Sequence, residues 1–181
     1  MMDKRLHMLA MLLLVVGGVN WGLVGAYDID IIKKVVKNKM MQRVIYITVG
    51  IVALYMASKR NTWLPFLGKT VVPCNLLNKK EPEGTDHKIV LNVGKGKKVI
   101  YWGAEEKEGE GEVEEVWKAY GELENSGVVE ADEEGNVELK FRYPQKYYVN
   151  KLLRKKELES HIHYRVCEDG MMLGEVKTIK V

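Results

Sequence analysis

The fold is decided by Leu6–Tyr27, which reads LHMLAMLLLVVGGVNWGLVGAY and contains no Asp, Glu, Lys or Arg. The charged triplet Asp3-Lys4-Arg5 precedes this run, and Asp28 follows it. A helix of this length extends about 33 Å, and the hydrocarbon core of a bilayer is about 30 Å thick. We therefore predict that the run spans a membrane and anchors the chain there.

A second apolar run, Val44–Ala57, lies between Arg43 and Ser58-Lys59-Arg60. As a helix it reaches only about 21 Å, which is short for a span. The side chains of Arg43 and Lys59 can extend to the headgroups and so compensate for the missing length. The sequence thus predicts a hairpin of two membrane-spanning helices.

Small residues follow helical spacing in both predicted spans, which would let the two backbones approach closely in lipid. Asn20 needs a polar partner there, and Thr48 is the candidate. A contact between two copies of the chain through the same small residues would compete with this intrachain pairing. The predicted packing residues are Gly18, Gly22, Gly25, Gly50 and Ala53.

The connector from Asp28 to Gln42 has the pattern of a short amphipathic helix at the membrane surface, with Asp28 as its cap. Its apolar face would carry Ile29, Ile32, Val36 and Met40. An ordinary solvated connector is the alternative. The residues predicted to lie at the membrane interface are Lys33, Lys34, Lys37, Arg43 and Trp63.

The charges around the two spans leave the orientation open, because Lys and Arg are plentiful on both sides. Val24-Gly25-Ala26 would also fit the cleavage site of a signal peptide. The preceding apolar run is longer than the usual 7–15 residues of such a signal, which favours a retained span.

Two motifs give the N-terminal part a family resemblance: Gly17-Gly18-Val-Asn-Trp-Gly-Leu-Val-Gly25 and Arg43-Val-Ile-Tyr-Ile-Thr-Val-Gly50, joined by an Asp-containing connector. Together they resemble a small bacterial membrane-protein family of unknown function, over about residues 5–58. The resemblance implies a two-helix fold and a membrane location, and it implies no activity.

The two halves of the chain differ in charge. Residues 1–85 carry twelve Lys and Arg against five Asp and Glu, whereas residues 86–181 carry sixteen against twenty. An acidic distal half weighs against nucleic acid as a partner, and a basic proximal half suits anionic lipid. Cys74 and Cys167 form no CxxC pair and are predicted to be free thiols, as in a reducing compartment.

The domain organisation follows from this division. Residues 1–60 are predicted to form the hairpin, 61–86 a Pro-containing interfacial segment and linker, and 87–181 an antiparallel β-sandwich. Gly-containing turns suggest three hairpins, and one short helix is expected within Glu112–Leu123. The hairpin strands are predicted at 88–93 with 97–102, at 128–131 with 137–143, and at 161–167 with 171–181.

One group of side chains in the distal half has possible metal chemistry. His161 and His163 lie two residues apart on a predicted strand, so both imidazoles would face the same side, and Tyr147-Tyr148 precedes them. Imidazole binds iron, copper or zinc, and a phenolate nearby would favour ferric iron. The alternative is two histidines on a solvated strand face.

The distal half also resembles the intradiol ring-cleavage dioxygenases, through Lys98-Val-Ile-Tyr-Trp102, Tyr143-Pro-Gln-Lys-Tyr-Tyr148 and His161-Ile-His-Tyr-Arg-Val166. In that family a β-sandwich holds ferric iron through two tyrosines and an H-x-H strand. The resemblance implies Tyr148, His161 and His163 as metal ligands. The chain has Glu110 at the place of the first tyrosine and Leu158 at the place of an arginine.

These departures favour a sandwich retained without catalysis. The expected function is therefore a non-enzymatic, membrane-anchored scaffold without a cofactor. The combination of domains suggests a minor virion component of a large DNA virus that links an inner membrane to capsid proteins. The alternative is a membrane-tethered, Fe3+-dependent dioxygenase that acts on an aromatic substrate.

Overall fold

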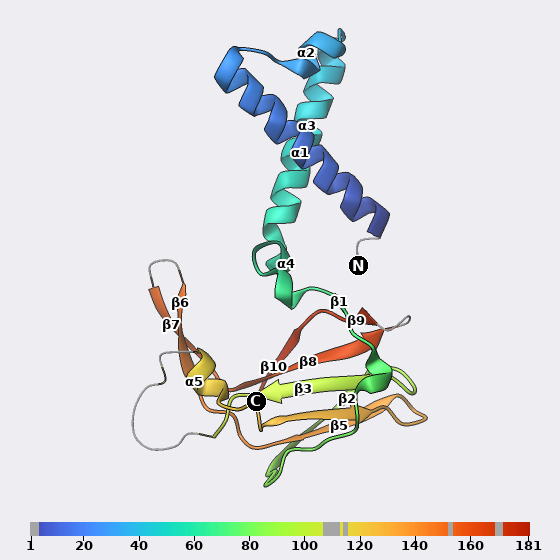
Figure 1. Cartoon of the computed structure of the whole chain (residues 1–181), viewed down its shortest axis with the longest axis vertical. Helices are drawn as coiled ribbons and strands as arrows, with labels where there is room; N and C mark the ends of the chain where they lie inside the picture. The colour runs from blue at the N-terminus through green and yellow to red at the C-terminus, as the bar shows by residue number, and fades with distance from the viewer. Residues whose placement is uncertain (1–3, 107–112, 114–115, 152–153, 169–171) are drawn as a thin grey trace. The chain divides into compact units, whose positions relative to one another are not determined.

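The computed structural model describes residues 4–106, 113, 116–151, 154–168 and 172–181. The chain divides into two compact units, Met1–Pro65 and Phe66–Val181, which we call the hairpin unit and the β domain. Each is described by itself below (Figure 1).

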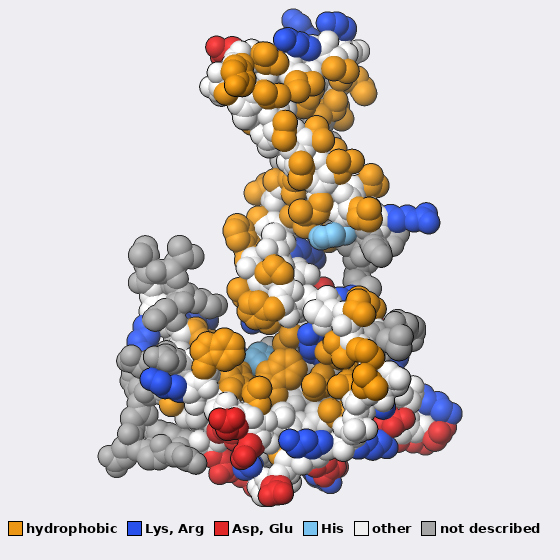
Figure 2. All heavy atoms as spheres, viewed as in Figure 1, with side chains coloured by type: hydrophobic (Ala, Val, Ile, Leu, Met, Phe, Trp, Pro, Cys, Tyr) orange, Lys and Arg blue, Asp and Glu red, His pale blue; other side chains and the backbone are white. Residues whose placement is uncertain are grey.

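The hairpin unit contains two long helices. Helix α1 covers Lys4–Tyr27 and helix α3 covers Lys39–Ser58, and both are long and apolar enough to cross a membrane. Most of their apolar side chains are exposed, for example Leu12 at 58%, Ile47 at 61% and Leu54 at 75%. Figure 2 shows hydrophobic side chains along both helices. A core helix of a water-soluble protein would bury such residues, so the exposure fits helices surrounded by lipid.

The connector differs from the predicted single amphipathic helix. Helix α2 covers only Ile31–Val35, and Asn38 then caps α3 by accepting hydrogen bonds from the backbone N–H groups of Met40 and Met41. Residues 39–43 therefore lengthen α3 beyond the apolar run, to about 30 Å. A short helix, α4 at Arg60–Trp63, follows it.

Helices α1 and α3 contact each other through Gly17, where an added Cβ would lie 2.8 Å from Cγ1 of Val49. The prediction that the other small residues form this contact is wrong. A Cβ added at Gly18, Gly22, Gly25 or Gly50 would meet nothing within 4 Å, and Ala53 is only half-buried. The GxxxG face lies away from α3 because Gly17 and the buried Ala10 and Asn20 occupy the contact side of α1.

The β domain is rich in antiparallel strands. The largest sheet has the order β1-β9-β8-β3-β4, with β10 also paired to β8, and two ribbons, β2-β5 and β6-β7, complete the described strands. The strands are β1 Thr70–Val71, β2 His87–Asn92, β3 Lys98–Gly103, β4 Ser126–Glu130, β5 Asn136–Phe141, β6 Tyr147–Lys151, β7 Arg154–Leu158, β8 His161–Glu168, β9 Met172–Leu173 and β10 Lys177–Lys180. The helical elements are α5 at Val116–Tyr120 and 3-10 turns at Pro65–Leu67 and Cys74–Leu76.

One face of β3 and β8 forms the main core with ribbon β2-β5. Its largest fully buried side chains are Tyr101, Leu139, Phe141 and Ile162. Tyr101 donates a hydrogen bond to the carbonyl of Lys140 at 2.7 Å, which connects the two layers. The opposite face of β3 and β8 is covered by other elements and carries the groups described in the next subsection.

Two of the three predicted hairpins are wrong, because their two strands do not pair with each other. Strand β2 pairs with β5, and β3 pairs with β4 and β8, so the turn at Gly94-Lys95-Gly96 carries the chain from one layer to the other. The turn around Asp132–Gly135 does the same between β4 and β5, which are not paired. A turn signal marks a reversal of the chain, but either two paired strands or two facing layers can follow it. The third hairpin is confirmed, since β8 pairs with β9 and β10.

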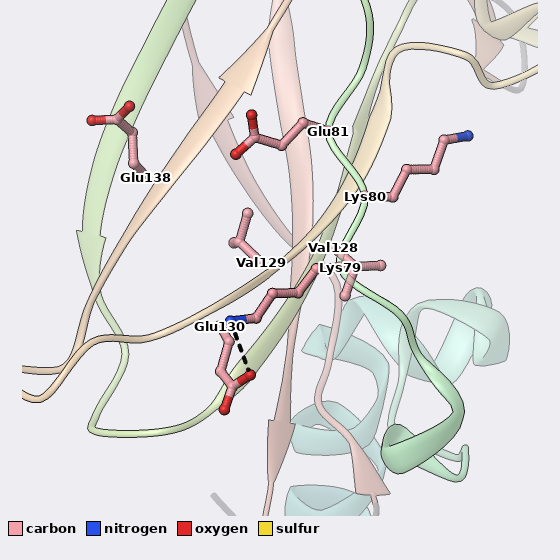
Figure 3. Close-up of a pocket in the computed structure, with 7 residues that line it drawn as sticks. All are labelled: Lys79, Lys80, Glu81, Val128, Val129, Glu130 and Glu138. Atoms are coloured by element: carbon pink, nitrogen blue, oxygen red, sulfur yellow. Dashed lines mark ion pairs between the residues drawn. The ribbon is translucent and has the colours of Figure 1, made fainter.

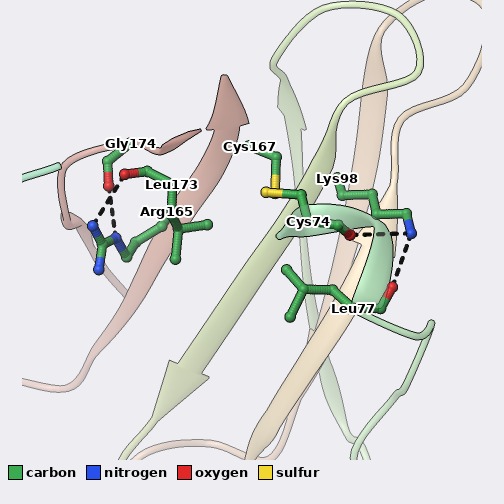
Figure 4. Close-up of a disulfide and its surroundings, with 7 residues drawn as sticks. All are labelled: Cys74, Leu77, Lys98, Arg165, Cys167, Leu173 and Gly174. Atoms are coloured by element: carbon green, nitrogen blue, oxygen red, sulfur yellow. Dashed lines mark hydrogen bonds between the residues drawn. A yellow bond between two sulfur atoms is a disulfide. The ribbon is translucent and has the colours of Figure 1, made fainter. Parts of the chain in front are cut away.

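The segment after Pro65 is part of the β domain, whereas the sequence predicted a linker up to residue 86. Strand β1 pairs with β9, and Lys80 pairs with Val128. The prediction of free thiols is also wrong, because Cys74 and Cys167 form a disulfide (Figure 4). Pro73 and the other prolines suggested an irregular connection, but irregular backbone can still pack when a covalent bridge and strand pairing fix it.

Candidate functional site

The face of β8 that points away from the main core carries four polar or sulfur-containing side chains at alternate positions: His161, His163, Arg165 and Cys167. Ile162, between the histidines, points into the main core. The pleat of the strand therefore places both imidazoles on one side, as the H-x-H spacing predicted. The centroids of their rings lie 4.7 Å apart in an edge-on arrangement.

Two tyrosines complete a cluster around His161. The Tyr147 hydroxyl lies 3.1 Å from Nε2 of His161 and 3.0 Å from the Tyr120 hydroxyl. The ring of Tyr120 stacks on that of His163 at 6.3 Å, and Trp102 lies 5.5 Å from the same imidazole. We call Tyr120, Tyr147, His161 and His163 the Tyr–His cluster.

Tyr148, which the sequence resemblance assigned as a ligand, does not face this cluster. It follows Tyr147 on β6, and successive side chains of a strand point to opposite sides. Its hydroxyl lies 3.5 Å from a carboxylate oxygen of Glu157, and Lys155 sits over its ring at 4.4 Å. Tyr147, and not Tyr148, is therefore the tyrosine of β6 that lies beside His161. Glu110, at the family's first tyrosine position, lies outside the described residues, and Tyr120 on α5 occupies the cluster.

Each imidazole is oriented through its Nδ1 atom. Nδ1 of His161 lies 2.5 Å from the carbonyl oxygen of Glu159, and Nδ1 of His163 lies 2.8 Å from the Thr178 hydroxyl. A carbonyl only accepts, so the proton of neutral His161 is on Nδ1 and its Nε2 accepts from Tyr147. The Tyr147 oxygen then accepts from Tyr120. With this tautomer of His161, the hydrogen bonds run in one direction from Tyr120 through Tyr147 to His161.

Burial, followed by the hydrogen bond to Tyr147, raises the pKa of Tyr120 well above its usual range. The phenol therefore stays protonated at neutral pH unless a cation replaces its proton. A metal ion would do this, since its ligands bind in deprotonated form.

The cluster has the donor types that ferric iron prefers, namely imidazole nitrogen and phenolate oxygen. Two donors about 2 Å from one ion lie roughly 3 Å apart, which matches the distances from Tyr147 to Tyr120 and to His161. Both histidines also have the Nδ1 support typical of metal ligands. Within the described residues, no group of three His, Cys, Asp or Glu side chains is arranged to hold a metal ion. Any such ion would therefore depend on the two tyrosines.

A separate open pocket of about 430 Å³ is lined by β4, β5 and the chain before β2 (Figure 3). Lys79 and Glu130 form an ion pair across it at 3.4 Å. Its lining is Lys79, Lys80, Glu81, Val128, Val129, Glu130 and Glu138, so it includes no member of the Tyr–His cluster.

The hairpin unit has its own polar cluster, made by Asn20 of α1, Asp30 of the connector and Tyr46 of α3. Oδ1 of Asn20 accepts from the backbone N–H of Ile31 at 2.8 Å, and the Tyr46 hydroxyl donates to Asp30 at 2.6 Å. Asp30 also caps α2 and accepts from the Asn20 amide at 3.4 Å. This corrects two predictions: the partner of Asn20 is not Thr48, which bonds within its own helix, and the cap of α2 is not Asp28.

The hydrogen bond from Tyr46 is the main reason why the pKa of Asp30 falls to about 2. Asn20, Asp30 and Tyr46 belong to the two motifs and the connector that carried the family resemblance. They therefore have a structural role, which is to close the hairpin.

The predicted interface residues are exposed in the connector and after α3. Lys33 pairs with Asp30 at 3.2 Å, while Lys34, Lys37 and Arg43 extend from the surface. Trp63 is 71% exposed, and its indole N–H donates to the carbonyl of Ala57 at 2.8 Å.

Comparison with known protein families gives a match that lies within the hairpin unit. Residues 4–59 match the family model described as a domain of unknown function, DUF378. No curated protein matches the chain. An intradiol ring-cleavage dioxygenase from Tetranychus urticae is a distant structural neighbour, with 17% identity and a TM-score of 0.34, over 62% of this chain. The chain spans 64% of that dioxygenase, and the likeness is too distant to carry an argument. The chain thus joins a DUF378-like N-terminal region to a β-sheet-rich region.

Proposed function

We propose that the protein is a membrane-anchored scaffold: the hairpin unit crosses the bilayer twice, and the β domain is a sandwich presented at the membrane surface. The apolar surface of α1 and α3 carries this proposal. Of the most apolar 18-residue stretch in each helix, only 17% is buried in α1 and 6% in α3. Each square ångström of apolar surface left in water costs about 25 cal/mol, so lipid is the medium that suits both helices.

The attachment between the two units supports a scaffold role. Only residues 59–65 separate the end of α3 from the β domain. The first residues of the domain are then fixed to β8 and β9 by strand pairing, by the disulfide and by Arg165. The Arg165 guanidinium donates to the carbonyls of Gly68 and Gly174 at 2.6 Å and of Leu173 at 3.1 Å. The segment between the proposed anchor and the fixed part of the β domain is therefore short.

The partner would be another structural protein, and the combination of domains suggests a viral capsid protein. The test is a binding assay with purified full-length chain in detergent and the candidate coat protein. Saturable binding that is retained by residues 66–181 alone supports the scaffold. No binding to either form contradicts a capsid partner.

The geometry of the Tyr–His cluster favours a second function, in which the β domain binds ferric iron and acts as a dioxygenase that oxidises an aromatic substrate with dioxygen. Tyr120, Tyr147, His161 and His163 would hold the ion, which would supply the oxidation chemistry. The chain's own residues orient the imidazoles through Glu159 and Thr178. Leu158 offers no charge to a substrate at the position where the resembling family has arginine.

Metal analysis of the full-length protein separates the two functions. The scaffold predicts no stoichiometric iron and no tyrosinate-to-iron absorption band after Fe3+ is added. The oxygenase predicts one iron per chain and a visible band. That band should be lost in Tyr147→Phe and His161→Ala and retained in the matched control Tyr148→Phe.

A further inference from the structure

The disulfide and the hairpin together indicate which side of the membrane each part occupies. We infer that the β domain and the N-terminus lie on the oxidising, non-cytosolic side, and that the connector 28–38 lies in the cytosol. This inference rests on the proposed membrane anchoring and adds its direction.

The first step is that the disulfide belongs to the packed interior of the β domain. Cys74 and Cys167 are each 8% exposed and form a small apolar cluster with Leu173. Beside them, the Lys98 ammonium donates to the carbonyl of Leu77 at 2.9 Å and to that of Cys74 at 3.4 Å (Figure 4). The bridge therefore joins two segments that are already held together, 93 residues apart in the sequence.

The second step concerns the compartment. Structural disulfides form and persist in oxidising environments, whereas the cytosol keeps protein thiols reduced. Two buried cysteines paired in the folded domain indicate that the domain matures on the oxidising side. The β domain then has to be on the non-cytosolic face of its membrane.

The third step follows from the two spans. Helices α1 and α3 contact each other and are joined by the short connector, so an antiparallel crossing returns the chain to the side where it started. The connector and the first five residues of α3 carry Lys33, Lys34, Lys37, Lys39 and Arg43 against Asp28 and Asp30. The positive-inside rule favours such a loop in the cytosol. Charge alone left the orientation open, because basic residues also flank the other ends, and the disulfide decides it.

The consequence for function is that partners of the β domain, a coat protein included, have to be sought on the oxidising side. The basic connector is left to interact with the anionic cytosolic leaflet. This leaflet attracts Lys and Arg near its surface.

The experiment uses the full-length chain made in bacterial cells, with one exposed residue changed to cysteine: Lys37→Cys in the connector or Lys95→Cys in the β domain. Right-side-out spheroplasts are treated with a membrane-impermeant maleimide. We expect Lys95→Cys to label at least tenfold faster than Lys37→Cys, which should react only after permeabilisation. The reverse order, or equal labelling of both, would overturn the inference.

A second readout uses the unmodified chain and does not depend on any variant. Cells are quenched with acid, which protonates thiols and stops thiol–disulfide exchange. Free thiols are then alkylated, and the alkylated cysteines are counted. We expect Cys74 and Cys167 to react only after reduction. Two free thiols per chain in the native membrane would contradict the assignment.

A matched pair of charge variants tests the role of the connector. Lys33→Glu/Lys34→Glu/Lys37→Glu should invert or mix the orientation and expose free Cys74 and Cys167 thiols. The same charge change in the β domain, Lys95→Glu/Lys156→Glu/Lys177→Glu, should leave both readouts unchanged. Unchanged orientation in the connector variant would overturn the role given to the connector charge, whereas the side of the β domain is decided by the order of labelling.

Alkaline extraction of the same membranes separates this inference from the proposed function. If the chain is released, the anchoring itself fails. If it is retained but labels in the reverse order, the anchor stands and only the direction is wrong.

Discussion

At the scale of single residues, the neighbouring Tyr147 and Tyr148 have opposite surroundings. Tyr147 is 3% exposed and joins Tyr120 to His161, whereas Tyr148 lies on the opposite side of the strand beside Glu157. The H-x-H spacing predicted correctly that both histidines share a face. The choice between the tyrosines could not be made by matching a motif, because a shift of one residue changes the face of a strand.

Tyr147→Phe should therefore lower the free energy of unfolding of the β domain by about 1–3 kcal/mol, because it leaves buried polar groups of Tyr120 and His161 without a partner. Tyr148→Phe should change it by less than about 0.5 kcal/mol. Denaturant titration of the full-length chain in detergent checks both. Equal effects of the two substitutions would contradict the placement of the cluster.

Tyr101 gives the β domain a pH dependence on the alkaline side. Burial, with the charge of Glu81 adding to it, raises the pKa of Tyr101 to about 12 from an ordinary value of about 10. A group whose pKa is higher in the folded state stabilises the fold fully below pH 10, and this contribution is lost as the pH rises through 12. We expect unfolding in this window, and Tyr101→Phe should weaken the pH dependence of the unfolding free energy. A pH profile unchanged by the substitution would contradict the burial of this phenol.

At the scale of elements, the helices were easier to predict than the strand partners. A long run without charges identifies α1 directly, and alternation in residues 98–103 identifies β3. Ribbon β6-β7 was missed because β7 is charged and exposed along most of its length and so shows no apolar alternation. The partner of β2 was missed because it lies about 50 residues further along the chain, beyond any local signal.

The contact of α1 with α3 through Gly17 can be tested against its neighbour Gly18. Alanine favours a helix over glycine by about 1 kcal/mol, so Gly18→Ala should stabilise the hairpin or leave it unchanged. In Gly17→Ala the new methyl group meets Val49, and the hairpin should be about 1–2 kcal/mol less stable than in Gly18→Ala. Adding Val49→Ala should remove most of this difference. Equal stability of the two glycine variants, measured by unfolding in mixed micelles, would show that the helices cross elsewhere.

At the scale of the whole molecule, the segment that follows the hairpin belongs to the β domain. Strand β1, Arg165 and the disulfide each fix residues 66–77 to β8 or β9. The sequence did not predict this, because two cysteines 93 residues apart give no sign of pairing and three prolines suggested a linker. The acidic character of the distal half and its separation from the apolar half were both visible in the sequence.

Removal of the disulfide should therefore weaken the whole β domain. Closing a loop of this length is worth about 2–5 kcal/mol in small domains. We expect reduction of the native chain to lower the free energy of unfolding by that amount, and Cys74→Ala/Cys167→Ala to show the same loss. The double variant should no longer respond to reductant. A native chain that is equally stable with and without reductant would contradict the bridge.

The central claim is that α1 and α3 lie in lipid and hold the β domain at the membrane. Alkaline carbonate extraction of membranes from cells that make the full-length chain tests it most directly. The account predicts that the intact chain stays in the membrane pellet, as proteins with spanning helices do. Recovery of the intact chain in the supernatant would contradict it.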